Sequence, residues 1–517
     1  MAQGYDMFDF KLYMLVGRLA TPVVRFFASR APKPRAAIIE SQVKTLRQLV
    51  RTARGTQFGR DHGFAKIRDV QDYQASVPVR DYEDFQQRYW ASDFPVLDDV
   101  TWPGRIPYFA KTSGTTSGKS KFIPCTLAMV RANNRAGTHV IMAHFHAMPK
   151  SRILLGRYFM FAGSPNLEEL APNVFAGELS GIAARETPFW AGRDRYYPPA
   201  ELAVITDWQE KLKLISEDCV DKNIRAISGL PSWLSILFAR MAERSPHEAT
   251  RLSNWFPDLQ LIVHGGMSFE PYRDQFSSLT RDLEVDFREV YAASEGFFAV
   301  SDGAQDEGMR LITNCGVFYE FIPLDRYQSD NPPRHWLAEV VTGVDYVLVV
   351  TTCAGLWSYV VGDIVRFVDV EDFRLRFAGR ISQTLSKFGE KVLNEEVEAV
   401  FAKVAQDHGL ELNDFAICPQ FEDNKGRYVL LMETKASNTS ADSVRLAADI
   451  DLALQAANSG YATRRLNDVA ILPPILHMLP VGSFAAWMES KGQAGGQHKV
   501  PRTISEKQMR ELMPPPS

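Results

Sequence analysis

The stretch TSGTTSGKSKFIP, residues 112–124, carries the strongest local signal in this sequence. Its glycines let a backbone approach a ligand closely, and successive N–H groups of such a loop can cradle phosphate oxygens. Its hydroxyl groups and two lysines, Lys119 and Lys121, add hydrogen-bond donors and positive charge. A Walker loop needs four residues between its two glycines, whereas Gly114 and Gly118 enclose only three. The stretch therefore predicts a phosphate-binding loop of another kind. A polar linker is the alternative, and the lysines followed by a strand-like FIP argue against it.

The apolar runs beyond this loop indicate an α/β fold. From residue 150 to 350, short apolar runs alternate with longer amphipathic stretches, and LQLIVH (259–264) ends in two glycines, as a buried strand before a tight turn would. Four strand-like runs lie close together within 336–380, and the first of them is WLAEVV (336–341). They predict antiparallel strands that complete a large N-terminal domain of helices and mixed sheets, residues 1–380.

The pattern then changes, which predicts a second and smaller domain. Asn394 is suited to cap an amphipathic helix that Gly409 can end. Two strand-like runs flank DNKG (423–426), a hairpin signal, and a second amphipathic helix and the short strand DVAILP (468–473) follow. This β-α-β-β-α-β order predicts a small α+β domain, residues 381–517.

The loop SGTTSGKSKFIP resembles the phosphate loop of the acyl-adenylating superfamily, which includes acyl-CoA synthetases, luciferases and peptide-synthetase adenylation domains. It is still more similar to SSGTTxGKPKFIPF, the loop of the Gretchen Hagen family of auxin-responsive acyl acid amido synthetases. The chain departs from that pattern at Thr112, Ser120 and Cys125. The resemblance implies a large acyl-adenylating domain, a small mobile C-terminal domain, and ATP phosphates held by this loop. The loop residues that it places on ATP are Ser113, Gly114, Thr115, Thr116, Lys119 and Lys121.

Two further motifs, YAASEG (291–296) and VHGGM (263–267), resemble parts of the same family's nucleotide site, with Ala293 where the family has a serine. The resemblance implies that Tyr291 stacks on adenine and that Glu295 holds Mg²⁺ against phosphate oxygens. A simple turn remains the alternative for each motif. The other residues that the resemblance places on ATP here are Ser294, Gly265, Gly266 and Met267.

Three later residues complete the resemblance. YVVGDIV is similar to the family's YRVGDVV, which implies that Asp363 binds the ribose hydroxyls, while Val360 replaces the family's arginine. Arg380, in FAGR, matches the residue before the superfamily's hinge, and the resemblance implies that it is a second ribose contact. HKVPR is similar to the family's QYKxPR and favours Lys499 as a catalytic lysine, with Lys507 as the alternative. A solvated lysine without a catalytic role is the simpler interpretation of either one.

Together the motifs imply an ATP-dependent ligase with two half-reactions. A small carboxylic acid attacks the α-phosphorus of ATP, while Mg²⁺ and Lys119 offset the negative charge and pyrophosphate leaves. The amine of an amino acid then attacks the acyl-adenylate, Lys499 acts in one of the two steps, and AMP leaves with formation of an amide. A thiol (coenzyme A or a carrier) or an alcohol is the alternative acceptor. A P-loop-like kinase and a catalytically inactive nucleotide sensor are the alternatives from other classes.

Composition sets the remaining expectations. The chain has 517 residues, of which 45% are hydrophobic, and its 58 Lys+Arg against 62 Asp+Glu give a net charge of −4. These values exclude a disordered or collagen-like chain and argue against a nucleic-acid partner. Five widely spaced cysteines without a CxxC pair predict reduced thiols in a cytoplasmic protein, which we expect to be a monomer.

Two features of the N-terminal half carry weaker expectations. No apolar stretch is long enough to span a membrane. We expect LYMLVGRLATPVVRFF (12–27) to be an amphipathic helix packed on the body of the protein, with weak peripheral membrane contact as the alternative. His144 and His146 match no zinc spacing, and no GxSxG motif anchors a hydrolase triad, so these histidines are expected to pack or to face solvent.

Overall fold

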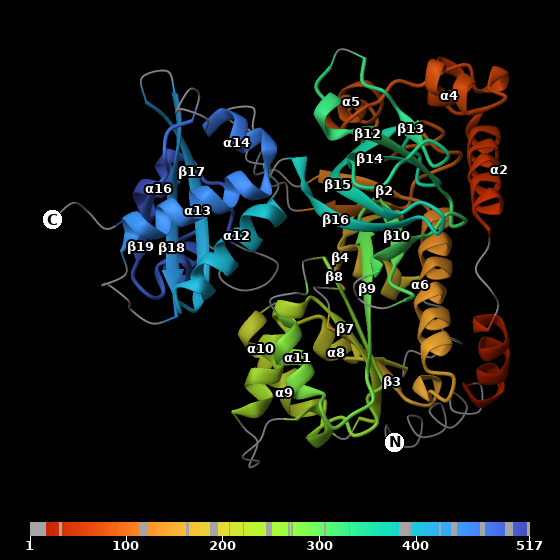
Figure 1. The fold of residues 1–517 in the computed structure, drawn as a ribbon. Helices are drawn as coiled ribbons and strands as arrows, with labels where there is room; N and C mark the ends of the chain where they lie inside the picture. Colours follow the sequence, from red (N-terminus) through yellow and green to blue (C-terminus); the bar gives the residue numbers. More distant parts are fainter. Residues whose placement is uncertain are drawn as a thin grey trace. The chain divides into compact units, whose positions relative to one another are not determined.

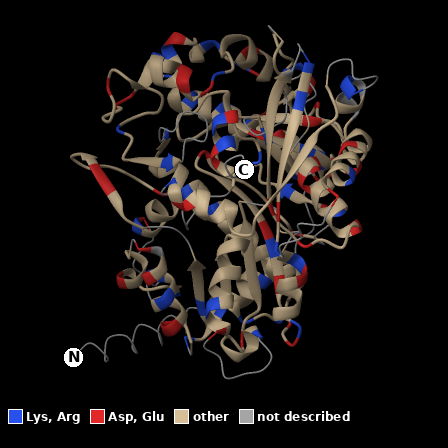
Figure 2. Cartoon of the chain, turned by 90° about the vertical axis from the view of Figure 1, so that its left-hand side faces the viewer, with Lys and Arg blue, Asp and Glu red and all other residues tan. Residues whose placement is uncertain are grey.

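The computed structural model divides the described residues into two compact units (Figure 1). The first unit is Met1–Val361 with Val365–Phe377, and the second is Gly362–Ile364 with Ala378–Ser517. Basic and acidic residues are interspersed over both units (Figure 2). The predicted division after residue 380 stays a prediction. The described residues are 17–29, 34–112, 121–161, 165–186, 195–205, 207–220, 222–243, 251–266, 269, 272–303, 307–329, 331–381, 392, 394–422, 425–435, 442–465, 471–491 and 500–513.

One long mixed sheet dominates the described part of the first unit. Its strands, in spatial order, are β13 (His335–Trp336), β12 (Val317–Pro323), β14 (Asp345–Thr352), β15 (Tyr359–Asp369), β16 (Arg374–Arg380), β11 (Met309–Leu311), β10 (Gly296–Val300), β9 (Asp286–Ala293), β8 (Leu261–Gly265), β7 (Ile224–Gly229), β3 (Arg157–Phe161) and β6 (Tyr196–Tyr197). Pairing is parallel from β9 through β8, β7 and β3 to β6. It is antiparallel between β9, β10, β11 and β16, and between β13, β12 and β14. The predicted α/β class with mixed sheets is confirmed.

Helices cover both faces of the parallel half, which explains why its strands are continuously apolar. Successive side chains of a strand point to opposite faces. Ile262 of β8 accordingly packs with α9 (Trp208–Asp218), α10 (Pro231–Ala242) and α11 (Arg273–Leu279). Its neighbours Leu261 and Val263 pack instead with α6 (Leu127–Ala147), which lies along the other face (Figure 1). The predicted buried strand at 259–264 is therefore present.

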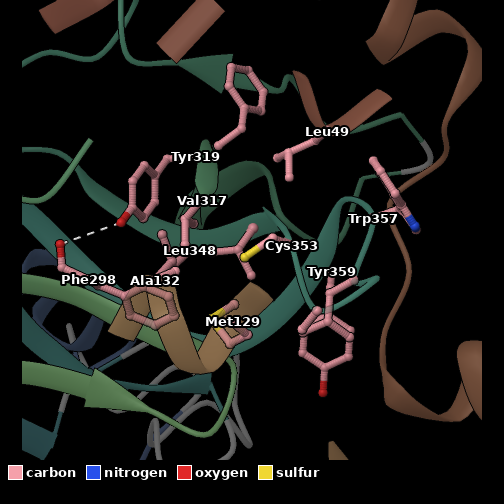
Figure 3. Close-up of a cluster of buried hydrophobic side chains, with 14 of the residues drawn as sticks. Leu49, Met129, Ala132, Phe298, Val317, Tyr319, Leu348, Cys353, Trp357 and Tyr359 are labelled. Carbon is pink, nitrogen blue, oxygen red and sulfur yellow. Dashed lines mark hydrogen bonds between the residues drawn. The ribbon is translucent and has the colours of Figure 1, made fainter. Parts of the chain in front are cut away.

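The antiparallel half surrounds an aromatic core that also receives α2 (Arg35–Ala53) and the start of α6 (Figure 3). The Tyr319 hydroxyl donates a hydrogen bond to the Ile312 carbonyl at 2.8 Å, and the Phe298 carbonyl lies 3.5 Å from the same hydroxyl. The buried amide of Gln42 donates to the Val317 carbonyl (2.9 Å) and accepts from the Tyr319 N–H (3.0 Å). Helix α2 is therefore fixed to β12 by satisfied polar contacts as well as by apolar packing.

A four-stranded sheet and several short helices complete the first unit. The sheet order is β2 (Lys121–Cys125), β1 (Tyr108–Thr112), β5 (Val174–Gly177) and β4 (Leu167–Ala171). The predicted strand WLAEVV is wrong beyond Trp336, because residues 337–339 form a turn. The remaining helices are α3 (Gln57–Asp61), α4 (Val70–Ser76), α5 (Tyr82–Phe85), α7 (Leu179–Arg185), α8 (Ala200–Ala203), η1 (Phe64–Lys66), η2 (Gln86–Trp90), η3 (Ile153–Leu155), η6 (Leu252–Asn254) and η9 (Leu324–Arg326).

The second unit is a three-stranded sheet with helices on both faces. Its strands are β17 (Leu412–Glu422), β18 (Lys425–Thr434) and β19 (Ile475–Leu479) in that order. The predicted hairpin is confirmed by the pairing of Glu422 with Lys425. Side chains of α12 (Asn394–Asp407) and α13 (Ser443–Ala457) pack in one core, and those of α15 (Ser483–Ser490) and α16 (Glu506–Leu512) in another. Helix α14 (Ser459–Arg465) contacts α13.

One predicted strand of this unit is misplaced. The strand expected at 468–473 is absent from its described residues 471–473, where only Ile471 makes an isolated bridge, and β19 begins at Ile475 instead. Pro473 and Pro474 explain the difference, because proline has no N–H to donate to a neighbouring strand.

The N-terminal helix predicted at 12–27 is confirmed only from residue 17, because residues 12–16 lie outside the described residues. Residues 17–28 are helical, and Ala20, Val24 and Ala28 pack in the same core as α6. In the described part of the chain, no helix is both long and apolar enough to cross a membrane. All five cysteines are free and buried.

Candidate active site

The two strands beside the predicted phosphate loop are paired with each other. Strands β1 and β2 run antiparallel, and Thr112 lies opposite Lys121. The loop between them, with Ser113, Gly114, Thr115, Thr116 and Lys119, lies outside the described residues. The strand pairing therefore fixes where the loop leaves and re-enters the sheet.

A short segment, Arg80–Glu83, holds the end of this loop. The Nζ of Lys121 lies 3.5 Å from a carboxylate oxygen of Glu83 and 5.1 Å from the centre of the Tyr82 ring. The Tyr82 hydroxyl accepts a hydrogen bond from the Phe122 N–H at 3.1 Å. The predicted phosphate contact Lys121 is thus positioned by an ion pair and a cation–π contact.

The same segment also holds the start of β15. The Arg80 N–H donates to the Ser358 carbonyl (3.1 Å), and the Arg80 carbonyl accepts from the Val360 N–H (2.9 Å). Burial holds the pKa of the Tyr359 phenol well above its ordinary value, and the negative charges of Glu295 and Glu83 add to the rise. The charges of both carboxylates therefore act on Tyr359, whose neighbours Ser358 and Val360 are bound by Arg80. The sequence analysis did not identify Arg80–Glu83, which carries no motif beyond a local helix cap.

Glu295 lies in the tight turn between β9 and β10. Ala293 pairs with Gly296, so Ser294 and Glu295 form the two-residue connection. Glu295 is buried at 8% exposure. Tyr291, near the end of β9, is 7% exposed and makes edge contacts with Phe298 and Phe377 at ring-centre distances of 5.1 and 5.8 Å. The predicted magnesium ligand and adenine contact thus share one hairpin.

Glu295 has the chemistry that a magnesium contact requires. Mg²⁺ in nucleotide sites is usually bound by one or two carboxylates together with substrate phosphates and water. No cluster of three or more His, Cys, Asp or Glu able to hold a metal occurs among the residues that the structure describes. By the general rule for nucleotide sites, a magnesium ion at Glu295 would share its coordination with the phosphates of bound ATP.

The predicted glycine turn follows β8, and its geometry requires glycine. A Cβ at Gly265 would lie 2.3 Å from the Val290 carbonyl oxygen of the neighbouring strand. Gly266 has a φ of +75°, a conformation that residues with a side chain rarely adopt. Met267, the third predicted residue of the turn, lies outside the described residues.

His264, immediately before this turn, is a buried neutral histidine. Its ring stacks on Phe269 with ring centres 4.0 Å apart, and it is 3% exposed. Burial, together with the charge of Arg273, lowers its pKa to about 4. Within the described residues its buried Nδ1 has no hydrogen-bond partner.

We expect His264 to make the first unit less stable in acid. In the unfolded chain its pKa is about 6.5, so between pH 6.5 and 4 the unfolded state binds a proton that the folded state does not. Stability is therefore lost as the pH falls through this window, by about 3 kcal/mol at most. The variant His264→Phe keeps the ring stack but cannot titrate. The free energies of unfolding of the wild type and of this variant, measured in urea, should therefore diverge as the pH falls from 7 to 4.5. Parallel stability–pH curves would contradict this assignment.

The two predicted ribose contacts meet on neighbouring strands, within the second unit. Arg380 Nε lies 3.0 Å from Asp363 Oδ1. The Asp363 side chain is 4% exposed, whereas that of Arg380 is 47% exposed. Each follows a glycine with positive φ, Gly362 at +91° and Gly379 at +140°. A carboxylate accepts several hydrogen bonds at once, so its pairing with Arg380 is compatible with a second role toward ribose hydroxyls.

The described residues around the two late lysines belong to the second unit. Lys499 is outside the described residues. Three residues later, Arg502 is held by Glu398 at 2.9 Å and lies 4.2 Å from the centre of the Phe415 ring. The Arg502 carbonyl accepts from the Ile417 N–H at 2.7 Å. The alternative, Lys507, is exposed in the first turn of α16.

A buried Ser-His-Asp set elsewhere in the first unit is structural. His144 Nδ1 lies 2.8 Å from Asp286 Oδ2, and its Nε2 lies 2.7 Å from Ser151 Oγ. Ser151 is 1% exposed and His144 is fully buried. Catalysis would need a substrate to reach the serine, so this set instead ties α6 to β9. His144 therefore packs, as expected, and His146 contacts the Ala28 carbonyl at 3.1 Å.

Comparison with known proteins places this chain among relatives of similar architecture. It is 23% identical to jasmonoyl–L-amino acid synthetase JAR4 of Nicotiana attenuata over 90% of both chains. It is 25% identical to indole-3-acetic acid-amido synthetase GH3.3 of Arabidopsis thaliana over 43% of this chain and 40% of that one. Its fold matches the solved structure of AtGH3.15 acyl acid amido synthetase in complex with 2,4-DB, with a TM-score of 0.73, 17% identity and coverage of 92% and 93%.

A more distant fold match is 2-hydroxyisobutyryl-CoA ligase in the postadenylation state, with a TM-score of 0.59, 14% identity and 91% of each chain covered. Three domain descriptions of one family match the sequence in order. They are the GH3 family N-terminal domain at residues 34–216, the central domain at 310–380 and the C-terminal domain at 395–508. These matches span most of the chain, which therefore belongs to the GH3 family, the family that its loop and nucleotide motifs resemble.

Proposed function

We propose that this protein is an ATP-dependent acyl acid amido synthetase. It adenylates a small carboxylic acid and transfers the acyl group to the amine of an amino acid, with release of pyrophosphate and AMP. The observation that carries this proposal is the match to all three GH3 domains, together with a curated relative named as an amino acid synthetase that covers 90% of the chain. Membership of an adenylating ligase family implies use of ATP.

The first half-reaction joins two anionic substrates, so positive charge is its main requirement. The carboxylate oxygen bonds to the α-phosphorus, and the bond from that phosphorus to the β-bridging oxygen breaks. Lys119 and Lys121, with the hydroxyls of Ser113, Thr115 and Thr116, bind the β and γ phosphates. Mg²⁺ held at Glu295 supplies further charge neutralisation when bound.

The nucleoside is held by the remaining predicted residues. Tyr291 and the glycine turn contact adenine. Asp363 accepts hydrogen bonds from the ribose hydroxyls, and Arg380 orients Asp363 through their 3.0 Å ion pair. That pair supports a ribose site, because it fixes a largely buried carboxylate in one orientation.

In the second half-reaction the amine nitrogen bonds to the acyl carbon, the bond from that carbon to the phosphate oxygen breaks, and the nitrogen loses a proton. Lys499, three residues before Arg502 in the sequence, acts in one of the two half-reactions. In this proposal the small domain, residues 381–517, moves about a hinge near residue 380 between the two steps. We further propose a cytoplasmic monomer.

A thioester-forming ligase is the second candidate, and the fold match to 2-hydroxyisobutyryl-CoA ligase favours it. The two candidates differ only in the acceptor. With an accepted acid and ATP, we expect amino acids to raise AMP release well above its rate without acceptor, and an acyl amide to be detected by mass spectrometry. Coenzyme A should leave the rate unchanged. Formation of acyl-CoA without formation of an amide would show that the protein is a thioester-forming ligase instead.

A further inference from the structure

Tyr82 and Glu83, the first two residues of α5, meet the strand that follows the predicted phosphate loop. The centre of the Tyr82 ring lies 5.1 Å from the Nζ of Lys121, and a Glu83 carboxylate oxygen lies 3.5 Å from the same atom. The Tyr82 hydroxyl accepts a hydrogen bond from the N–H of the next residue, Phe122, at 3.1 Å. One aromatic side chain therefore holds both the ammonium group and the backbone at the end of the loop.

Tyr82 is suited to this task because its own position is fixed. Its ring contacts that of Trp90, which is 1% exposed, at a ring-centre distance of 5.7 Å. Burial raises the pKa of the Tyr82 phenol, so the phenol stays neutral and the face of its ring attracts the ammonium group of Lys121. A lysine loses side-chain freedom when it binds a ligand, and a contact that restricts it beforehand favours binding. Tyr82 should therefore strengthen the binding of an anion by Lys121.

Glu83 contacts the same ammonium group but should have the opposite effect on an anion. The distance of 3.5 Å is longer than the roughly 2.7–2.9 Å of a charge-assisted hydrogen bond, and 56% of the Glu83 side chain is exposed, so the ion pair is weak. A phosphate oxygen bonded to Lys121 in this position would lie within about 7 Å of the Glu83 carboxylate, which is less than the screening length of about 8 Å at physiological ionic strength. The two negative groups would repel each other. Glu83 should therefore lower the affinity of this lysine for phosphate.

We propose that Tyr82 and Glu83 are positioning residues that set, through Lys121, how tightly the enzyme binds the phosphates of ATP. Tyr82 holds the ammonium group in place for the phosphates, and Glu83 is the ion-pair partner that the phosphates replace. The inference rests on the proposed function, because Lys121 is a predicted phosphate contact. A site without this carboxylate would also hold the pyrophosphate product more tightly, so Glu83 favours product release.

Isothermal titration calorimetry with ATP and Mg²⁺, without acid or amine, measures binding apart from the reaction. We expect Glu83→Gln to lower the Kd for ATP by about three- to fivefold at low salt, and about 0.5 M NaCl to remove most of that gain. Tyr82→Leu should raise the Kd by about threefold or more. Tyr82→Phe keeps the ring beside Lys121 and should raise the Kd less.

Each variant has a matched control. Asp84→Asn removes the same charge as Glu83→Gln one residue further along α5, where the carboxylate pairs with Arg88 at 4.0 Å, and its Kd for ATP should stay within about twofold of the wild-type value. Lys121→Met keeps an unbranched side chain without the charge. If Tyr82 acts through Lys121, Tyr82→Leu should change the Kd of this background by less than about 1.5-fold.

The inference would be wrong if Glu83→Gln raised the Kd or left it unchanged, if Asp84→Asn lowered it equally, or if Tyr82→Leu kept its full effect beside Lys121→Met. A general loss of structure would weaken ATP binding in both variants, so opposite signs separate positioning from folding. ATP–pyrophosphate exchange by the wild type distinguishes two kinds of failure. Acid-dependent exchange together with one of these results would overturn the inference alone, whereas a wild type that neither binds ATP nor shows exchange would overturn the proposed function as well.

Discussion

Replacing Lys119 with alanine is expected to lower the rate of acid-dependent ATP–pyrophosphate exchange by about 100- to 1,000-fold, the usual cost of removing one group that stabilises developing charge. Lys119 lies in the loop between the paired strands β1 and β2, close in sequence to Lys121, which Glu83 holds at 3.5 Å. Because the reaction brings a carboxylate to a triphosphate, the loss of one ammonium group should mainly raise the free energy of the transition state.

Lys111→Ala is the matched control for this variant. Lys111 lies on β1 just before the same loop, but it is paired with Glu168 and lies 5.5 Å from the centre of the Phe122 ring. Its replacement removes an equal charge from the neighbourhood and should change the exchange rate by less than about threefold. If Lys119→Ala exchanged at a near wild-type rate, or if both variants lost the same fraction of the exchange rate, the loop would have no specific role in the mechanism.

The second large effect is expected for Asp363→Ala, as a rise of about 10- to 100-fold in the KM for ATP with a smaller change in kcat. Hydrogen bonds to a charged group contribute about 1.5–3 kcal/mol, and each 1.4 kcal/mol corresponds to a factor of ten. A ribose contact made equally in the ground state and the transition state affects mainly KM. Steady-state kinetics over a range of ATP concentrations measures both constants.

The control for Asp363 is Asp345→Ala, which removes another Asp–Arg pair in the same sheet. Asp345 of β14 binds Arg366 of β15 at 2.7 and 2.9 Å. If the Asp363 effect came only from disturbing paired strands, the two variants would show similar kinetics. We expect the KM for ATP to stay unchanged in Asp345→Ala. An unchanged KM in Asp363→Ala would contradict the ribose assignment.

Local patterns predicted most of the fold. The alternation of apolar runs before residue 350 indicated the buried strands, and Gly409, with a φ of +65°, follows the end of α12 where the sequence suggested. The failures also have local causes. The prolines Pro473 and Pro474 interrupt the predicted strand, so β19 begins only at Ile475. The short helices α15 and α16 were not predicted, because this part of the sequence lacks a long amphipathic pattern. The structure shows a capping box of Ser505 with Gln508 at the start of α16, a local signal that the sequence analysis did not use.

The site was predictable only as a set of separate motifs. The tight turn at Ser294–Glu295 and the glycine conformations follow from residues adjacent in sequence. The pairing of Asp363 with Arg380 depends on which strands become neighbours, and a single sequence does not contain that information. The segment Arg80–Glu83 is the clearest omission, because its contacts with Lys121, Phe122 and Ser358 join residues that are far apart in the chain.

The most direct test of the central claim is ATP–pyrophosphate exchange with the wild-type protein, scanned over small aromatic, indolic and aliphatic carboxylic acids in the absence of any amine. Acyl adenylation is reversible, so an accepted acid should carry labelled pyrophosphate into ATP, and Lys119→Ala should lose that signal. We predict exchange that depends strictly on the acid, with AMP as the only other nucleotide product. Formation of ADP from ATP, with no acid-dependent exchange, would contradict the assignment of this chain as an adenylating enzyme.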